Sequence, residues 1–408
     1  MHGGRAGPAL IRSPVAANLR LRLLESITDV PASAWDALAG PDAPPFVRHA
    51  WLSAMEESGS AQPDTGWEPQ HLTLWRGKQL VAASPAYRKQ HSMGEYIYDF
   101  AWASAAQRIG IEYYPKLVVG APLSPATSPR FLIAPGEDVP ALRHALIQAA
   151  IESAREGGCS SVHFLYPRED EADLLEQQGL ARRVTLQFHW KNPGYRSYDE
   201  YLSRFDSKRR SQLKRERGAA ANQGIVIRTV RGQELSLEHA RRAFRFYEAT
   251  CESRGPWGQV QLTEDFFVRA FRSLPDMVEL VQAEREGKVI AGAFNLVTPE
   301  RLYGRYWGCF EEHPFLHFHV CLYHSVDECI QTGRKVFEPG AGGEHKIARG
   351  FEPTAVHSAH LLFDKTLDRA VRDFLRREHA HLQPAIEQAE QLAGLKPWPL
   401  PGQDRATG

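Results

Sequence analysis

One plan occurs twice in this chain, in HLTLWRGKQLVAASPAY (residues 71–87) and in VELVQAEREGKVIAGAFNLV (residues 278–297). Each stretch begins with an apolar strand, turns tightly at Gly-Lys and continues as an apolar strand that runs into alanine or glycine. Apolar runs on either side of such a turn predict a β-hairpin. A hairpin that recurs far along the chain indicates a repeated structural unit.

Helix and strand patterns follow both hairpins in a similar order. After the first hairpin, a helical pattern covers residues 142–155 and a strand pattern covers 162–166. After the second, we expect strands at 302–308, 335–340 and 350–363, with a helix at 320–334. This alternation predicts an α/β fold with a mixed (α+β) sheet, and its recurrence predicts one domain used twice. Two unrelated α/β units that share a common turn are the alternative.

The composition is that of a soluble globular protein. The 408 residues include 49 Lys+Arg and 49 Asp+Glu, so the formal net charge is zero, and 43% of the residues are hydrophobic. Zero net charge excludes a generally cationic coat for nucleic acid, and we expect no DNA partner. The five cysteines include no C-x-x-C pair, and no apolar run is long enough for a membrane span. We therefore expect a cytoplasmic protein without a membrane span.

Residues 203–217 (SRFDSKRRSQLKRER) form a strongly basic segment between the two predicted domains. It holds seven basic side chains against two acidic ones, a net of +5. At helical spacing, Arg210, Lys214 and Arg217 share a face. Such a helix suits the phosphates of a tRNA or of a nucleotide cofactor. A solvated helix whose charges are balanced by acidic neighbours is the alternative, and the residues leave both open.

A glycine-rich loop with several ionisable residues follows the predicted strand at 335–340. Its glycines, which include Gly342 and Gly343, allow the backbone to bend sharply and to present N–H groups. An acid, a titratable base and two cations lie close together in it, at Glu344, His345, Lys346 and Arg349. This pattern predicts a cradle for an anion or an acyl donor. A turn whose charges pair with one another is the alternative.

Further candidates lie on the strand and helix that precede this loop. Arg305, Tyr306 and Trp307 occupy the predicted strand, and the helix after it carries His317 and His319. No H-E-x-x-H or paired-cysteine spacing accompanies these histidines, so we predict no metal site.

The first predicted domain has its own dense polar cluster, at His91, Ser92, Glu95, Asp99 and Trp102. Aromatic and ionisable residues close to glycine can line a substrate cleft. They can equally form a domain interface.

Several motifs in order carry a resemblance to a known family. They are PFVRHAWLSAMEESG (45–59), SPAYRKQHSMGEYIYDFAWA (84–103), DSKRRSQLKRER (206–217) and FEPGAGGEHKIARGFEPTAVHSAH (337–360). Over about residues 33 to 380, the chain resembles the FemAB-like peptidoglycan biosynthesis/recognition proteins of the GNAT-fold acyltransferase superfamily. The resemblance implies two tandem GNAT-like domains, which agrees with the repeated hairpin.

Domain boundaries follow from these patterns. We predict a flexible N-terminal tail at 1–18, a first GNAT-like domain at 19–200, a basic connecting helix at 201–224, a second GNAT-like domain at 225–385 and a flexible C-terminal tail at 394–408.

The resemblance also implies functional positions and shows two departures from the family. The family's motif residues correspond to His91, Ser92, Glu95, Asp99, Lys208, Arg209, Arg210, Gly343, Glu344, His345, Lys346, Arg349 and Phe351. His319 stands where the family favours glutamate, and neither copy has the R/Q-x-x-G-x-G/A loop with which acetyl-CoA users bind pyrophosphate.

The hypothesis from sequence is a GNAT-fold N-acyl or aminoacyl transferase. The donor would be an acyl-CoA or an aminoacyl-tRNA, without a tightly bound cofactor, and the acceptor a small-molecule or peptide amine; tRNA is thus a possible partner. The candidate base is Glu344 or His345, with His317 or His319 behind it. The predicted substrate-binding residues are His91, Ser92, Glu95, Asp99, Trp102, Arg305, Tyr306, Trp307, Lys346, Arg349 and Phe351. The predicted cofactor-binding residues are Lys208, Arg209, Arg210, Lys214, Gly342 and Gly343. The alternative is a non-catalytic GNAT-like protein that recognises a peptidoglycan precursor or another amphipathic ligand.

Overall fold

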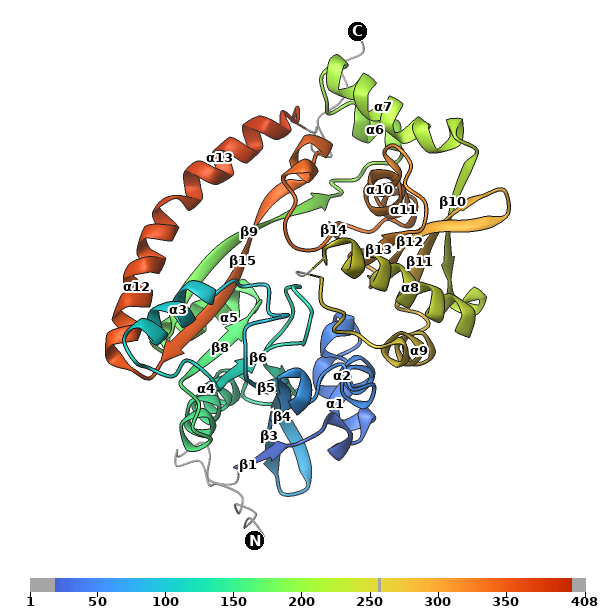
Figure 1. The fold of residues 1–408 in the computed structure, drawn as a ribbon. Helices are drawn as coiled ribbons and strands as arrows, with labels where there is room; N and C mark the ends of the chain where they lie inside the picture. Colours follow the sequence, from blue (N-terminus) through green and yellow to red (C-terminus); the bar gives the residue numbers. More distant parts are fainter. Residues whose placement is uncertain (1–18, 256–257, 398–408) are drawn as a thin grey trace.

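The computed structural model describes residues 19–255 and 258–397, apart from the side chain of Glu344 (Figure 1). The predicted tail at residues 1–18 and the end of the second predicted tail, residues 398–408, lie outside the described residues. The fold is mixed α/β, as predicted from the sequence.

Two groups of elements follow one another along the chain. The first group is β1 (Leu19–Leu24), η2 (Ile27–Asp29), α1 (Ala32–Ala39), η3 (Pro45–Val47), α2 (His49–Glu57), η4 (Pro63–Thr65), β2 (Trp67–Pro69), β3 (His71–Arg76), β4 (Gln79–Ser84), β5 (Ala86–Lys89), α3 (Phe100–Arg108), β6 (Lys116–Val119), β7 (Leu132–Ile133), α4 (Val139–Glu156), β8 (Ser161–Leu165), α5 (Glu169–Gln177), β9 (Ala181–Lys191) and α6 (Tyr198–Leu202). The second group is α7 (Ser207–Asn222), β10 (Ile225–Arg231), η5 (Gly232–Glu234), α8 (Leu237–Ser253), α9 (Glu264–Ser273), β11 (Val278–Arg285), β12 (Lys288–Val297), β13 (Arg301–Cys309), α10 (Leu316–Phe318), the π-helical turn η7 (His319–Tyr323), α11 (His324–Thr332), β14 (Val336–Glu338), η8 (Glu344–Arg349), β15 (Glu352–Leu362), α12 (Lys365–Ala380) and α13 (Leu382–Ala393).

Both hairpins predicted from the repeat are confirmed. β3 pairs with β4 and β11 pairs with β12, each pair antiparallel. Gly77 and Gly287 lie in the turns at φ +60° and +75°, a conformation that favours glycine. The first hairpin belongs to a four-stranded sheet with the order β1-β3-β4-β7, and the second to an eleven-stranded sheet.

The eleven-stranded sheet runs through both halves of the chain. Its order is β10-β11-β12-β13-β14-β9-β15-β8-β6-β5-β2. β15 comes late in the sequence, yet it lies between β9 and β8 and pairs with both of them. β14 in turn joins β13 to the end of β9. Figure 1 shows β9 and β15 side by side at the centre of the molecule.

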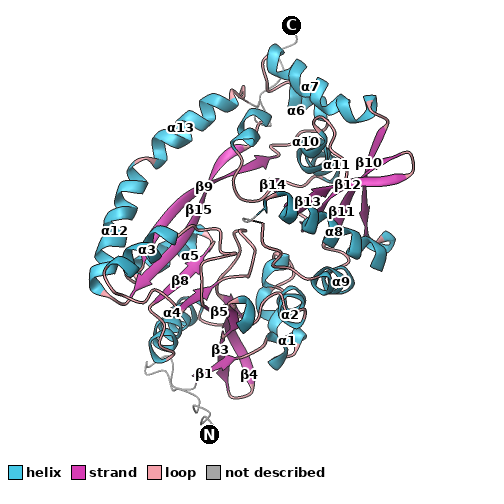
Figure 2. Cartoon of the chain, in the orientation of Figure 1, coloured by secondary structure: helices cyan, strands magenta, loops and turns pink. Residues whose placement is uncertain are grey.

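The outer side of β9 and β15 is covered by two helices. α12 and α13 follow one another along these strands, as Figure 2 shows. Beyond α13, residues 394–397 remain in contact with the connecting region, because the Lys396 N–H donates to the Arg204 carbonyl at 2.8 Å.

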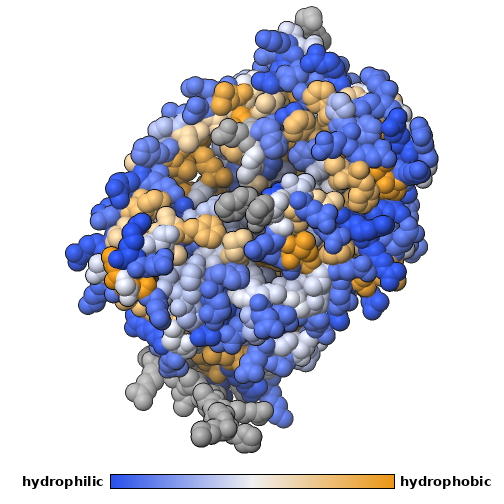
Figure 3. Space-filling model, viewed as in Figure 1, coloured by the Kyte–Doolittle hydropathy of each residue, from blue (hydrophilic) through white to orange (hydrophobic). Residues whose placement is uncertain are grey.

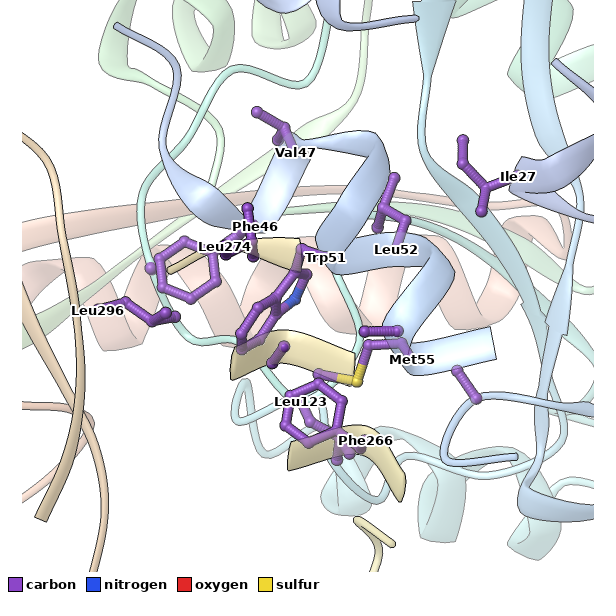
Figure 4. Close-up of a cluster of buried hydrophobic side chains, with 14 of the residues drawn as sticks. Ile27, Phe46, Val47, Trp51, Leu52, Met55, Leu123, Phe266, Leu274 and Leu296 are labelled. Carbon is purple, nitrogen blue, oxygen red and sulfur yellow. The ribbon is translucent and has the colours of Figure 1, made fainter. Parts of the chain in front are cut away.

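A shared hydrophobic core joins the two halves. Figure 4 shows Phe46, Trp51 and Leu123 packed with Phe266 and Leu296, all of them buried. The rings of Trp51 and Phe266 meet edge to face at 5.1 Å. Burying large aromatic side chains across the seam stabilises one arrangement of the halves.

The surface is mainly polar on the face seen in Figure 3. On the face shown in Figure 3, hydrophilic residues predominate and the hydrophobic ones form separate small patches. None of the helices in the described ranges combines the length and the apolar character that crossing a bilayer requires.

Candidate functional site

β13 and β14 separate after a short stretch of pairing, which leaves free backbone at the centre of the large sheet. The two strands are hydrogen-bonded only where Arg301–Tyr303 faces Val336–Glu338. β13 continues to Cys309 in register with β12, whereas the chain after Glu338 bends away through Pro339 and Gly340. The β14 side of β13 is therefore open beyond Gly304.

A β-bulge places Arg305 at this opening. The register between β12 and β13 passes from Asn295–Gly304 to Phe294–Tyr306, so Arg305 has no partner on β12. Bulges bend a strand and change the direction of a side chain. The guanidinium lies 4.5 Å from the ring centre of Phe46, and its Nε and Nη2 are buried without a hydrogen-bond partner.

Loops in strained conformations surround Arg305 and Tyr306. Tyr96, Leu123 and Tyr166 have positive φ angles of 60°, 54° and 51°. Hydrogen bonds join them to each other and to the strand: Tyr166 OH donates to the Tyr96 carbonyl, and Tyr306 OH to that of Leu123. Left-handed backbone in bulky residues is costly and tends to cluster at functional sites.

The glycine-rich loop encloses the amino group of Lys346. Its Nζ donates to the carbonyls of Gly340 at 2.8 Å and of Gly342 at 2.6 Å. Burial and the charge of Arg305 together lower the pKa of Lys346 to about 8, against the effect of Cys321. Lys346 thus stabilises the glycine-rich loop by donating hydrogen bonds to backbone carbonyls of that loop.

Rings from three elements gather beside this loop. His317 of α10 contacts Trp307 of β13 at 4.9 Å and His345 of η8 at 6.0 Å between ring centres. Burial lowers the pKa of His317 to about 4. Partial burial and the charges of Lys346 and Arg349 also lower the pKa of His345, which remains exposed. Both imidazoles are therefore neutral at pH 7.

Arg349 is engaged within the protein. It donates to Glu216 Oε2 at 2.7 Å, to Tyr323 OH at 2.7 Å and to the His345 carbonyl at 2.8 Å. Its guanidinium also stacks on the Phe318 ring at 3.5 Å. Burial opposes ionisation of Glu216, but hydrogen bonds from Tyr323 and Gln212 and the charge of Arg349 bring its pKa below the ordinary value.

Two further predicted residues of this region are placed apart from the Arg305 opening. His319 starts the π-helical turn, and burial lowers its pKa to about 4. Phe351 is buried and packs on Phe337. Glu344 begins η8, and its side chain lies outside the described part.

The polar cluster of the first half is a buried charge network centred on Lys116. Its Nζ donates to Ser92 at 2.9 Å, Glu95 at 2.8 Å and Asp99 at 2.5 Å. Tyr113 OH also donates to Asp99, at 2.6 Å. Burial alone would lower the pKa of Lys116, but the charges of Glu95 and Asp99 raise it. Burial raises the pKa of Glu95 to about 7, against the charge of Lys116.

A second buried lysine borders this network. Lys89 lies 3.6 Å from the ring centre of Trp67 and donates to the Met93 carbonyl at 3.1 Å. Burial lowers its pKa to about 7, against the charge of Glu95. His91 lies beside Lys89, and its Nδ1 accepts a hydrogen bond from the Met93 N–H.

Two buried histidines connect the halves behind this network. Nδ1 of His163 on β8 and Nδ1 of His360 on β15 are 2.6 Å apart, and the outer nitrogens bond to Ser161 and Ser358. Trp102 packs edge-on against His360 at 4.8 Å. Trp102 thus lies in the interior rather than on an open surface.

The cations of α7 lie at the surface. Lys208 and Lys214 are exposed, and Arg209 and Arg210 are half-buried. Lys214 pairs with Asp199 at 3.2 Å, and Arg209 donates to Gln212.

The structure thus brings Trp307, His317, His345 and Lys346 together beside the glycine-rich loop, with Arg305 close to Lys346. Tyr306 instead packs on Tyr247, Phe267 and Phe294. The first-half residues form a separate buried network. Sequence analysis missed Glu216, Tyr323, Tyr303 and Glu338 as members of this region. Within the described residues, no group of three or more His, Cys, Asp or Glu side chains could hold a metal ion.

Among solved structures, the crystal structure of FemX matches this fold with a TM-score of 0.51 at 12% identity, over 84% of this chain and 98% of FemX. A tandem GNAT protein from the clavulanic acid biosynthesis pathway matches at 14% identity and a TM-score of 0.43, over 84% of this chain and 98% of that one. The C-terminal domain of a putative lysylphosphatidylglycerol synthetase from Agrobacterium fabrum matches at 10% identity and a TM-score of 0.48, over 84% of this chain and 94% of that one. No curated protein sequence matches the chain.

The fold is thus that of FemX, and its mixed α/β class is as the sequence predicted. The chain belongs to the FemAB-like family, described as peptidoglycan biosynthesis/recognition, which its sequence matches over residues 26–397. The resemblance seen in the sequence motifs is confirmed.

Proposed function

We propose that this FemAB-like protein is an N-acyl or aminoacyl transferase, which moves an acyl group from an acyl-CoA or an aminoacyl-tRNA to an amine. The separation of β13 from β14 carries the proposal. Among the described residues, β14 supplies no pairing partner to β13 beyond Tyr303, and Trp307 and His317 lie beside this unpaired edge. Free N–H groups there can bind the carbonyl oxygen of a donor and stabilise the negative charge that develops on it.

The reaction requires a neutral amine and a base. The amine nitrogen attacks the donor carbonyl, a C–N bond forms, the C–S or C–O bond to the carrier breaks, and the amine proton passes to a base. His345 fits this role because it is exposed and its pKa is lowered, so its ring is neutral at pH 7. The sequence candidate Glu344 is the second choice.

The test is transfer of a labelled acyl group. Acetyl-CoA, longer acyl-CoAs and aminoacyl-tRNA are each supplied with muropeptides as acceptors, and amide products are measured by mass spectrometry. We expect His345→Ala to reduce the rate by about 100-fold or more, and Glu344→Gln to be compared beside it. His379→Ala, an exposed histidine of α12, is the control. The wild-type rate should fall as pH drops below the pKa of His345, since protonation removes the base.

Two results would contradict the proposal. One is the absence of product, and of any thermal stabilisation, with every donor. The other is full activity of the folded His345→Ala and Glu344→Gln proteins. The salt dependence of donor binding distinguishes the two donors. Binding of tRNA by Lys208, Lys214 and their neighbours should weaken steeply as salt rises, whereas binding of acyl-CoA should weaken only slightly.

A binding protein without catalysis is the second candidate. It is favoured by the internal hydrogen bonds of Lys346 and Arg349, which occupy the cations of the glycine-rich loop. Binding of muropeptides without transfer from any donor would support it.

A further inference from the structure

Three neighbouring side chains at the opening between β13 and β14 have buried polar atoms without a partner among residues 19–255 and 258–397. They are Nε and Nη2 of Arg305, the hydroxyl of Tyr303 and Oε2 of Glu338. The other carboxylate oxygen of Glu338, Oε1, is paired with Arg301 at 2.6 Å. Buried polar atoms are almost always hydrogen-bonded, and an unpaired buried charge is costlier still. Such a concentration of unused donors and acceptors indicates a missing partner.

These atoms face one place in the fold. Tyr303 and Glu338 are direct partners in the β13–β14 register, so their side chains lie side by side. The Arg305 guanidinium lies 5.7 Å from the Tyr303 ring centre. Glu338 is the strongest charge that opposes the lowering of the Arg305 pKa by burial, although the two form no ion pair.

A cavity adjoins this group of residues. It measures about 390 Å³ and is lined by residues 39–44 and 127–129 and by Arg168, Thr298, Glu300, Arg301 and Tyr303. Of the three side chains, Tyr303 lies in its wall, whereas Arg305 and Glu338 lie behind Tyr303 and do not line it. Cavities of this size accept small ligands. Both halves of the chain contribute to its wall.

The unused atoms define the chemistry of a ligand. Nε and Nη2 lie on one edge of the guanidinium, where their N–H groups can donate side by side to two oxygens of a carboxylate. Oε2 of Glu338 needs a donor, which an ammonium group supplies. Tyr303 OH can serve either group. A simple anion would leave Glu338 unpaired, and a simple amine would leave Arg305 unpaired.

We propose that Arg305, Tyr303 and Glu338 bind the zwitterionic end of an amino acid, with its carboxylate on Arg305 and its ammonium group on Glu338. The amino acid is the acceptor or the terminal part of one, and an ammonium group held by Glu338 must lose a proton to the base before its nitrogen attacks the donor. As an assignment of the acceptor this rests on the proposed transferase function, whereas the binding site itself does not.

Calorimetry on the full-length protein tests the site. Each proteinogenic amino acid is titrated alone, and the tightest one is compared with its N-acetyl derivative, its amide, sodium acetate and inorganic phosphate. We expect at least one amino acid to bind, and each blocked form to bind about 10-fold or more weakly. Arg305→Gln and Glu338→Gln should weaken binding of the amino acid to a similar degree, and Tyr303→Phe should weaken it less. The exposed control Arg215→Gln should leave binding unchanged.

The contrary results are distinct. If no amino acid binds the wild-type protein, the proposal is overturned and the three side chains are satisfied by water alone. If acetate, phosphate or the N-acetyl form binds as tightly as the amino acid, the assigned ligand class is wrong. The titrations with blocked ligands use the wild-type chain, so they remain decisive even where a variant does not fold. If the protein binds an amino acid but transfers no acyl group, the transferase proposal is refuted and the binding site stands. If folded Arg305→Gln transfers the acyl group with an unchanged KM for the acceptor, the transferase proposal stands and the assignment of this site to the acceptor is refuted.

Discussion

Buried charges in this protein find their partners far away in the sequence. Glu216 is an acidic residue in the most basic helix of the chain, and it turns inward to Arg349 of the glycine-rich region. Its spacing alone gives no sign of this contact, because Arg349 follows 133 residues later. A count of charges therefore describes the basic segment as a whole, but it does not identify Glu216 as the residue that anchors the helix to the glycine-rich region.

Removing the Glu216 carboxylate should be strongly destabilising. Glu216→Ala leaves Arg349 and Tyr323 without their acceptor in the interior, and breaking a buried pair costs about 3–5 kcal/mol. Urea unfolding measures the loss.

Asp199→Ala is the matched control for Glu216→Ala. Its partner Lys214 is exposed, as Asp199 is, so its loss should stay below about 1 kcal/mol. Equal losses in the two variants would mean that the Glu216–Arg349 pair contributes no more than a surface pair.

At the scale of elements, the pairing of β8 with β15 includes a hydrogen-bonded pair of histidines. Burial and the charge of Lys116 together lower the pKa of His163 to about 3, against the charge of Asp99. Burial, His163, Arg183 and Lys116 lower the pKa of His360, again against Asp99. Both rings are thus neutral when the protein is folded at pH 7.

This pair predicts a loss of stability in acid. The unfolded chain binds protons at these histidines below about pH 6.5 while the native state does not, so the free energy of unfolding decreases as pH falls from there. Between pH 7.5 and 5.5 we expect each ring to lower the free energy of unfolding by about 1 kcal/mol. Urea unfolding at the two pH values measures the difference.

Double substitution tests the origin of that loss. His163→Asn together with His360→Asn should reduce the decrease by about 2 kcal/mol. The rest should remain, because other buried histidines such as His317 and His319 also have lowered pKa values. The exposed control His379→Gln should keep the whole decrease. An unchanged decrease in the double variant would assign the acid sensitivity to other groups.

Elements near the open strand edge were partly predictable. The hairpins, β13, β14 and β15 follow from apolar runs and turns, because those patterns are local. The β-bulge at Arg305 and the separation at Gly304 depend on how strands pair, and no local pattern specifies pairing.

At the scale of the molecule, the second half of the chain contributes a strand to the sheet of the first half. β15 belongs by sequence to the second predicted domain and by hydrogen bonding to the sheet of the first, between β8 and β9. We therefore expect residues 19–200 alone to lack a cooperative thermal transition, since β8 and β9 would expose unpaired edges.

A fused fragment provides the comparison. Residues 19–200 joined by a flexible linker to residues 350–397 should regain cooperative unfolding in calorimetry, because β15 and its two covering helices are restored. If residues 19–200 alone unfold as cooperatively as the fused fragment, β15 is dispensable for the first sheet.

The sequence by itself determined the α/β class, the repeated hairpins and the family, because these depend on local periodicity, turns and contiguous motifs. It also placed Trp307, His317, His345 and Lys346 near one another in the chain. Only the tertiary structure decided that Arg349 binds Glu216, that Lys116 pairs with both Glu95 and Asp99, and that Tyr303, Glu338 and Arg305 lie together with unused polar atoms. Those contacts arise when strands and helices distant in sequence are packed together, and side-chain pairing at that range is set by the packing.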